Sequence, residues 1–288
     1  MYLRYLEYNK KFNDLGKEKY ILKWEIEFYK NYILGDKDKA FEIRNEFLPK
    51  KLYKYQGTED FRITTLENNE LYFSSKDKLN DPFDLSPIYY DKNEISKMKL
   101  CNVNEIDNIL ENAANNMGIL SLSTTPLNMH LWAHYADNHK GICVEYDIES
   151  IKDLDTYFKY RILKVHYISE RLDVTNILKK LFEYIKNNDE YNQIRMAKCF
   201  YMSMTLKHKD WSYEDEWRIF MPLEECNSSS QIGRYKNPLR ISAIYIGKDC
   251  ICSDIDKIKL ISQKLKCKVY KMGYPCSSNN FSLVPKEI

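Results

Sequence analysis

The first part of the chain carries the hydrophobic pattern of amphipathic helices. Within residues 17–34, apolar residues recur at steps of three and four and so form one stripe along a helix; they are Ile21, Trp24, Phe28 and Tyr32. Gly35 interrupts this pattern, Asp36 is suited to cap a second helix, and Pro49 limits that helix. We therefore predict a helical hairpin over residues 1–49, which either packs on the rest of the protein or offers a surface for a partner or for homo-oligomers.

From residue 50 onward the pattern changes to short apolar segments separated by helical ones. The segments "GILSLSTT" (118–125), "GICVEYDI" (141–148) and "ISAIYIG" (241–247) are typical of strands. Helical patterns lie between them, at 173–206 and again at 254–265. Strands and helices do not alternate as regularly as in a doubly wound sheet. The pattern predicts an α+β domain over residues 50–288, built from small mixed sheets with packed helices.

Composition narrows the functional classes. Lys and Arg number 44 and Asp and Glu 42, so the net charge of +2 gives no strong overall attraction to nucleic acid or membrane. The 8 cysteines form no CxxC pair, so a zinc ribbon is not predicted. The N-terminal segment lacks an apolar run of signal-peptide length, and no stretch approaches the ~18 apolar residues of a membrane span. We expect a cytoplasmic protein with reduced thiols and no membrane partner.

Two local motifs carry residues that can form sites. His130 and His134 stand four apart on a predicted helix, but Leu131 occupies the position where a metalloprotease has its glutamate. Two histidines alone do not complete a tetrahedral site, so no metal site is predicted. The segment "LNDPFD" (79–84) has the residues of a turn, and we expect Asp81 and Asp84 to shape a pocket rather than to carry out chemistry.

The segment "WSYEDEWR" (211–218) is the main candidate for chemistry. Glu214 and Glu216 stand two apart, and on a strand that begins by residue 214 they would face the same way. Two such carboxylates can hold a sugar hydroxyl or stabilise an oxocarbenium-like cation. A solvated edge strand with its acids paired to lysines is the other interpretation. The chain has no GxSxG, GxxxxGK[ST] or GxGxxG motif, so a serine hydrolase, a phosphate loop and a Rossmann site are not supported.

Several segments in order are similar to a known family. They are "LYFSSKDKLNDPFD", "LSLSTTPLNMHLWAHYADNHKGICVEYD", "KHKDWSYEDEWRIF" and "ISAIYIGKDC". The chain resembles, over about residues 50–285, the bacterial family called domain of unknown function 2971. This resemblance brings no settled chemistry with it.

A more distant resemblance, to the ADP-ribosyltransferase fold with its toxin and phage-defence branches, implies a specific activity. The early block of that fold would be "YKYQGT", with Lys54 or Tyr55 as the binding residue. The middle block would be "SLSTT", with Ser121 and Ser123, although its Ser-Leu-Ser differs from the usual Ser-Thr-Ser. The late block would be "YEDEW".

What this resemblance implies is that NAD is bound as a substrate between two small sheets. Glu216 would hold the nicotinamide-side ribose, and Glu214 would orient an acceptor, which is a protein, a nucleic acid or water. Three side chains of the following helix would line the same pocket; they are Trp132, His134 and Tyr135.

Two other classes of function stay open at this level. In a non-enzymatic defence or interaction module, the Glu-x-Glu segment would be scaffold, neutralised by Lys207, Lys209 and Arg218. In a metal-dependent nuclease, Asp81 and Asp84 would hold Mg²⁺ together with Glu214 and Glu216.

Overall fold

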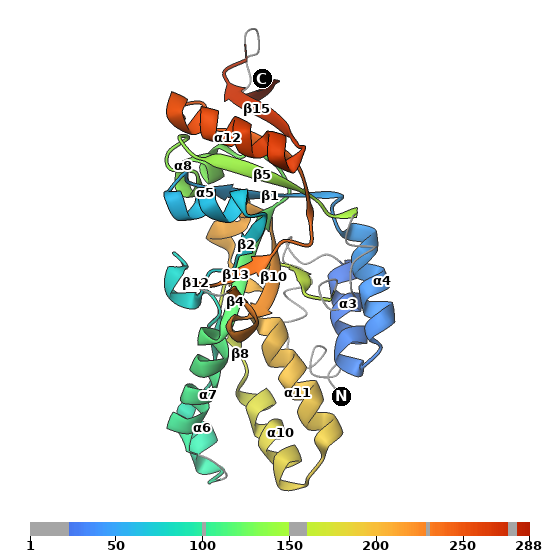
Figure 1. The fold of residues 1–288 in the computed structure, drawn as a ribbon. Helices are drawn as coiled ribbons and strands as arrows, with labels where there is room; N and C mark the ends of the chain where they lie inside the picture. Colours follow the sequence, from blue (N-terminus) through green and yellow to red (C-terminus); the bar gives the residue numbers. More distant parts are fainter. Residues whose placement is uncertain (1–22, 100–101, 150–159, 229–230, 276–280) are drawn as a thin grey trace. The chain divides into compact units, whose positions relative to one another are not determined.

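The computed structural model describes residues 23–99, 102–149, 160–228, 231–275 and 281–288 (Figure 1). It contains helices and mixed sheets, which confirms the predicted α+β class. The chain divides into two compact units. Unit 1 comprises residues 1–48, 76–117 and 165–212, and unit 2 comprises residues 49–75, 118–164 and 213–288. Each unit is described by itself below.

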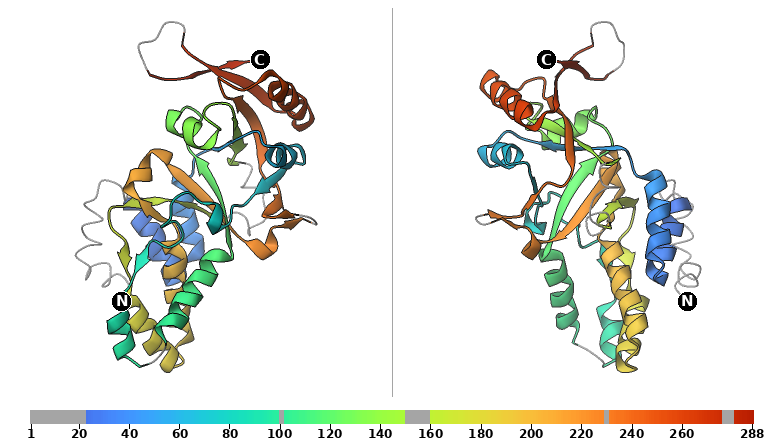
Figure 2. Two further views of the ribbon diagram at one scale, coloured as in Figure 1. Left: turned by 90° about the vertical axis from the view of Figure 1, so that its left-hand side faces the viewer. Right: turned by 45° about the vertical axis from the view of Figure 1, so that its right-hand side comes forward.

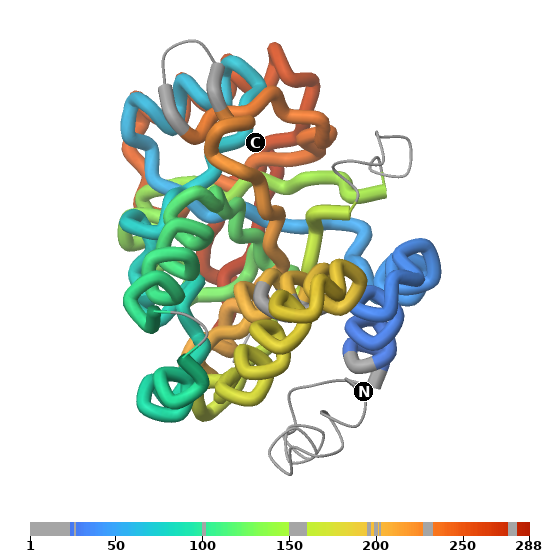
Figure 3. Tube along the Cα trace, turned by 90° about the horizontal axis from the view of Figure 1, so that it is seen from below, coloured from blue at the N-terminus to red at the C-terminus, as the bar shows by residue number. Residues whose placement is uncertain are grey.

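Unit 1 is mainly helical. Its helices are α3 (Lys23–Leu34), α4 (Lys37–Phe47), α6 (Lys92–Lys97), α7 (Val103–Asn115), α10 (Thr175–Lys186) and α11 (Glu190–Ser203), with the 3-10 turn η1 (Lys76–Lys78). Helix α3 lies beside α4, and α10 lies beside α11 (Figure 3). Two parallel strand pairs complete the unit; they are β3 (Ile88–Tyr89) with β8 (Leu172–Asp173), and β7 (His166–Ile168) with β9 (Leu206–His208).

The hairpin of α3 and α4 follows from its sequence. Gly35 adopts a φ of +99°, which side chains other than glycine rarely allow, and so ends α3. Asp36 accepts a hydrogen bond from the backbone N–H of Lys39 at 3.2 Å, which confirms the predicted helix cap. Ile33, at the end of α3, shares one buried apolar cluster with Ile95 and Ile177. The hairpin therefore takes part in the core of unit 1.

The expected division at residue 49 differs from this arrangement. The predicted piece comprised residues 1–49 alone, whereas unit 1 also contains two later segments of the chain. Residues 1–22 lie outside the described residues, and with them the predicted stripe position Ile21. Independent folding of residues 1–49 stays a prediction, which limited proteolysis near residues 49–52 tests.

Unit 2 is organised around a mixed eight-stranded sheet with the order β16-β15-β14-β5-β1-β4-β10-β6. These strands are β16 (Val284–Glu287), β15 (Lys268–Gly273), β14 (Arg240–Ile246), β5 (Ile142–Asp147), β1 (Lys51–Gln56), β4 (Met117–Ser123), β10 (Glu216–Pro222) and β6 (Ile162–Lys164). Strand β1 is antiparallel to both neighbours, and β14 and β15 are parallel because α12 (Cys252–Leu265) connects them. Figure 2 shows this sheet from two further sides.

Smaller elements of unit 2 flank the sheet. They are α5 (Asp60–Glu67), α8 (Met129–Tyr135), the turn η4 (Leu223–Glu225), the pair β2 (Glu70–Tyr72) with β13 (Arg234–Lys236), and the pair β11 (Asn227–Ser228) with β12 (Gln231–Ile232). The 3-10 turn η3 (Lys209–Glu214) begins in unit 1 and ends in unit 2. No helix in the described part of the chain has the length and hydrophobicity of a membrane span.

Alternation along β1 gives the sheet two different faces. Tyr53 and Tyr55 share a buried cluster with Leu131 and Trp132 of α8, so we call this side the α8 face. Lys54 points the other way, towards residues of α5, and we call that side the α5 face. The position of each candidate side chain depends on which of these faces it occupies.

Candidate functional site

Helix α8 is fixed at its start by Asn128. The side-chain oxygen of Asn128 accepts hydrogen bonds from the N–H groups of His130 at 2.9 Å and Leu131 at 3.2 Å, as an N-cap residue does. Its amide nitrogen donates to the carbonyl oxygen of Tyr213. One residue thus both caps α8 and ties it to the segment that carries the candidate acids.

Tyr55 connects β1 to the loop that follows β4. Its hydroxyl donates to the carbonyl oxygen of Thr125 at 2.8 Å and accepts from the N–H of Asn128 at 3.2 Å. Its ring packs edge-on against Trp132 at 5.3 Å. Tyr53, two residues earlier, is the Cα partner of Ser123 in the β1–β4 pair. The early and middle blocks of the predicted site therefore meet on the α8 face.

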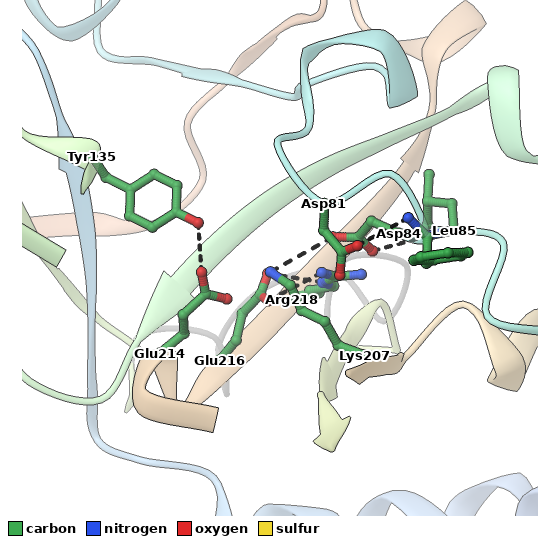
Figure 4. Close-up of polar contacts among 9 residues, drawn as sticks. Asp81, Asp84, Leu85, Tyr135, Lys207, Glu214, Glu216 and Arg218 are labelled. Carbon is green, nitrogen blue, oxygen red and sulfur yellow. Dashed lines mark hydrogen bonds and ion pairs between the residues drawn. The ribbon is translucent and has the colours of Figure 1, made fainter. Parts of the chain in front are cut away.

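The two glutamates do not lie on one strand. Turn η3 ends at Glu214, Asp215 adopts a φ of 42°, and β10 begins only at Glu216. For both acids to face the same way, the strand would have to begin by residue 214, and it begins two residues later. Tyr135 of α8 donates a hydrogen bond to Glu214, whereas Glu216 faces Arg218, two residues along β10 (Figure 4).

The Glu216–Arg218 pair is buried and bidentate. Arg218 Nε lies 2.8 Å from one carboxylate oxygen of Glu216, and Arg218 Nη2 lies 3.0 Å from the other. The side chain of Arg218 is fully buried and that of Glu216 is 3% exposed. Both carboxylate oxygens of Glu216 are therefore engaged by a cation in a water-poor environment, where such bonds are strong.

Asp215, between the two glutamates, contacts the ends of two strands. Thr124, just after β4, donates a hydrogen bond to its carboxylate, and Lys164, at the end of β6, forms an ion pair with it. Burial raises the pKa of Asp215, but the charge of Lys164 and the hydrogen bonds from Lys164 and Thr124 outweigh burial, so the pKa lies below its usual value. The carboxylate of Asp215 links the middle and late blocks.

The other predicted site residues differ in solvent exposure and in their hydrogen-bond partners. The hydroxyl of Ser123 is buried and has no hydrogen-bond partner among the described residues, while Ser121 is partly exposed. His134 is exposed, and its ring centroid lies 6.1 Å from that of Tyr213. Trp132 is fully buried and donates its ring N–H to the carbonyl oxygen of Pro126 at 2.8 Å, so it packs in the core. The ring of Trp132 is therefore not exposed for stacking on a ligand.

The structure thus places Tyr55 and Ser123 on the α8 face and joins Tyr135 to Glu214, whereas Lys54 points to the opposite face of the sheet. Asn128 was not among the predicted site residues, although its position before an apolar helical segment is a recognisable N-cap signal. Lys164 carries no local signal in the sequence, because its contact with Asp215 joins residues far apart in the chain. In the described part of the chain, no group of three or more His, Cys, Asp or Glu side chains is arranged to hold a metal ion.

The predicted turn at 80–84 is confirmed and belongs to unit 1. The carboxylate of Asp81 accepts from the N–H of Phe83 at 2.9 Å, and that of Asp84 accepts from the N–H of Leu85 at 3.0 Å. Lys207 Nζ lies 3.7 Å from a carboxylate oxygen of Asp84 (Figure 4) and 4.8 Å from the ring centroid of Trp211. Both aspartates hold the turn, and Asp84 also pairs with a buried lysine of that unit.

The comparisons with known proteins bear on the same segment. Residues 131–219 match the family model described as "Protein of unknown function (DUF2971)". The matched range includes Tyr135, Glu214 and Glu216, whereas Tyr55 and Ser123 precede it. No curated protein and no solved structure matches the chain. The similarity to the DUF2971 family therefore covers residues 131–219 of the chain.

Proposed function

We propose that this protein binds NAD on the α8 face of unit 2 and transfers or hydrolyses its ADP-ribose group, as an effector of the toxin or phage-defence kind. One observation carries the proposal. The blocks "YKYQGT", "SLSTT" and "YEDEW" stand far apart in the sequence, yet hydrogen bonds join each to the next: Tyr55 to Thr125, and Thr124 to Asp215. A folding scaffold alone does not require polar residues from all three blocks at one place.

The chemistry assigned to Glu214 differs from that assigned to Glu216. In the proposed reaction the bond between the ribose and nicotinamide breaks, nicotinamide leaves with the bonding electrons, and the ribosyl cation is captured by an acceptor. Glu214, held by the Tyr135 hydroxyl and 5% exposed, supplies negative charge in a desolvated setting, where charge stabilisation is strong. Glu216 is bound by Arg218 and stabilises the start of β10, the strand that follows Glu214.

Ser123 is the second element that supports this proposal. A buried hydroxyl without a hydrogen-bond partner is costly to a fold, so such groups usually have a partner that arrives with water or a ligand. A ribose hydroxyl or the carboxamide of nicotinamide could serve as the hydrogen-bond partner of the Ser123 hydroxyl. The proposal gives Ser123 a binding role and gives Tyr135 a positioning role for Glu214.

The test is nicotinamide release from NAD by the full chain. Glu214→Gln is expected to lower the rate about a hundredfold, the usual cost of losing one charge contact made in the transition state. Tyr135→Phe should lower the rate less, because it removes only the hydrogen bond that orients Glu214. The matched control is Glu149→Gln, since Glu149 is exposed and pairs at the surface with Lys50 at 3.2 Å. Absence of nicotinamide release, or equal rates for wild type and Glu214→Gln, would refute the proposal.

A non-enzymatic interaction module is the second candidate, and the Glu216–Arg218 pair favours it. Arg218 neutralises one acid of the Glu-x-Glu segment inside the protein, as a scaffold role requires. In that case NAD is left unchanged by the wild-type protein, and Glu214→Gln alters only stability. The nuclease alternative has no comparable support among the described residues, which form no metal-binding group.

A further inference from the structure

Asn128 connects the start of α8 to the peptide group that precedes Glu214. Its side-chain amide donates to the carbonyl oxygen of Tyr213, while its side-chain oxygen accepts from two N–H groups of α8. The opposite orientation of the amide would place its NH₂ group against those two N–H groups, so the partners themselves define which end faces Tyr213. The side chain of Asn128 is therefore the donor in a hydrogen bond between two distant segments of unit 2.

This hydrogen bond restricts the backbone of Glu214. The carbonyl oxygen of Tyr213 belongs to the same planar peptide group as the N–H and the Cα of Glu214, so a bond to that oxygen also holds the start of Glu214. On the other side, Asp215 has a φ of 42°, a conformation that is uncommon for residues other than glycine. The backbone of Glu214 thus lies between a hydrogen-bonded peptide group and a turn.

The carboxylate of Glu214 is held by the same helix. Tyr135, which donates a hydrogen bond to it (Figure 4), is the last residue of α8, and Asn128 is the N-cap of that helix. Because α8 has 7 residues and an α-helix has 3.6 residues per turn, these two positions are about two turns apart and lie on the same side of the helix. Helix α8 consequently binds Glu214 at two points, the peptide group through Asn128 and the carboxylate through Tyr135.

The sheet in turn holds Asn128. The hydroxyl of Tyr55 accepts from the backbone N–H of Asn128 at 3.2 Å and donates to the carbonyl oxygen of Thr125 at 2.8 Å. Tyr55 is buried, and its strand β1 lies inside the sheet between β5 and β4. Hydrogen bonds therefore lead from the sheet through Asn128 to Glu214, and a site acid needs support of this kind from rigid elements.

We propose that Asn128 is a positioning residue for Glu214, and that its hydrogen bond to Tyr213 aligns the Glu214 carboxylate with the ribose of NAD. Because Glu214 acts on NAD only in the activity proposed above, this role of Asn128 depends on that activity. Tyr55 then serves to hold Asn128, rather than to bind NAD through its hydroxyl. A misplaced carboxylate still permits NAD to bind but stabilises the transition state less well, so kcat should change more than KM.

The test separates the two hydrogen-bonding roles of Asn128. Asn128→Ser keeps a good helix cap, since Ser caps about as well as Asn, but it carries no amide to donate to Tyr213. In the nicotinamide-release assay, kcat should fall roughly five- to tenfold, the loss of one neutral hydrogen bond, while KM for NAD stays within about twofold. The melting temperature should change by less than about 2 °C.

The matched control is the same substitution at another helix cap. Asn102 caps α7 in unit 1 by accepting from the N–H of Asn104 at 3.0 Å. Asn102→Ser should therefore leave both kcat and KM at their wild-type values.

A second set of variants distinguishes positioning from general stability. In a Glu214→Gln background, Asn128→Ser should cause little further loss of rate, because both changes act on the same carboxylate. Asn128→Asp also keeps the cap, but it places a carboxylate oxygen against the carbonyl oxygen of Tyr213, so kcat should fall at least as far as in Asn128→Ser. Asn128→Asp takes the place of Asn128→Ser if the latter does not fold.

Three results would overturn this role. If the wild type releases nicotinamide and Glu214→Gln is impaired, but both Asn128 variants keep the wild-type kcat, the activity stands and Asn128 has no part in it. If Asn128→Ser lowers the rate by the same factor with and without the Glu214 carboxylate, Asn128 is a structural residue. If the wild type releases no nicotinamide, the proposed activity itself is refuted, and the positioning role with it.

Discussion

The buried pair of Glu216 and Arg218 makes a prediction about stability that contradicts the role the sequence suggests for Glu216. A site acid can be changed to glutamine with little effect on folding. Here Glu216→Gln keeps the shape of the side chain but replaces one acceptor oxygen by an NH₂ group that faces an N–H of Arg218. It also removes the negative charge that compensates a fully buried guanidinium.

The magnitude follows from the geometry. Removing one partner of a buried ion pair typically costs about 3–5 kcal/mol. Glutamine retains one carbonyl oxygen, which still accepts one of the two bonds, so the lower end of about 3 kcal/mol applies. For a chain of this size each kcal/mol corresponds to roughly 2–4 °C in melting temperature, so a fall of about 6–12 °C is expected.

The assay is thermal unfolding followed by circular dichroism, with Glu224→Gln as the matched control because Glu224 is exposed just after β10. Arg218→Gln and the double variant complete a double-mutant cycle, with an expected coupling energy of about 2 kcal/mol. If Glu216→Gln melts within about 1 °C of the wild type and loses only nicotinamide release, the pair is not structural. Glu216 would then be the essential acid that the sequence pattern indicated.

Other residues of unit 2 give predictions about pH and packing. Burial raises the pKa of Glu145, but hydrogen bonds from Lys51, Ser242 and Tyr245 outweigh burial and lower the pKa overall. The ionised Glu145 therefore stabilises the fold fully above the unfolded pKa of about 4.3, and this stabilisation is lost as the pH falls through the folded pKa. The unfolding free energy of Glu145→Gln, measured with urea, should therefore depend less on pH below about pH 5 than that of the wild type. Parallel pH profiles of the two proteins would contradict this. Gly141→Ala places a Cβ 2.2 Å from the carbonyl oxygen of Gln56 and should cost about 2 kcal/mol or more, measured by the same unfolding assay. Gly273→Ala is its control, because no atom lies within 4 Å of the added carbon, and equal stability of the two variants would show that the loop gives way freely.

Local features were predictable because neighbouring residues decide them. The cap at Asp36, the break at Gly35 and the turn at 80–84 depend on hydrogen bonds that span only a few positions. The apolar runs of β4, β5 and β14 were visible for the same reason, since alternation and β-branched residues are read within one strand. These features were enough to give the α+β class.

The tertiary structure decided which residues Glu214 and Glu216 contact. The spacing of Glu214 and Glu216 carries information only if both lie on one strand, and where β10 begins depends on its pairing with β6, in which Trp217 lies opposite Lys164. The positive φ of Asp215 then turns Glu214 towards Tyr135 and leaves Glu216 to Arg218.

The same limit applies to β1. Alternation predicts that Lys54 and Tyr55 point to opposite faces, but the sequence does not say which helix covers which face. Helix α8 packs on the side of Tyr55, and α5 lies on the side of Lys54. Because these packings join segments separated by long stretches of chain, they are fixed by burial and shape across the whole unit and not by any local pattern.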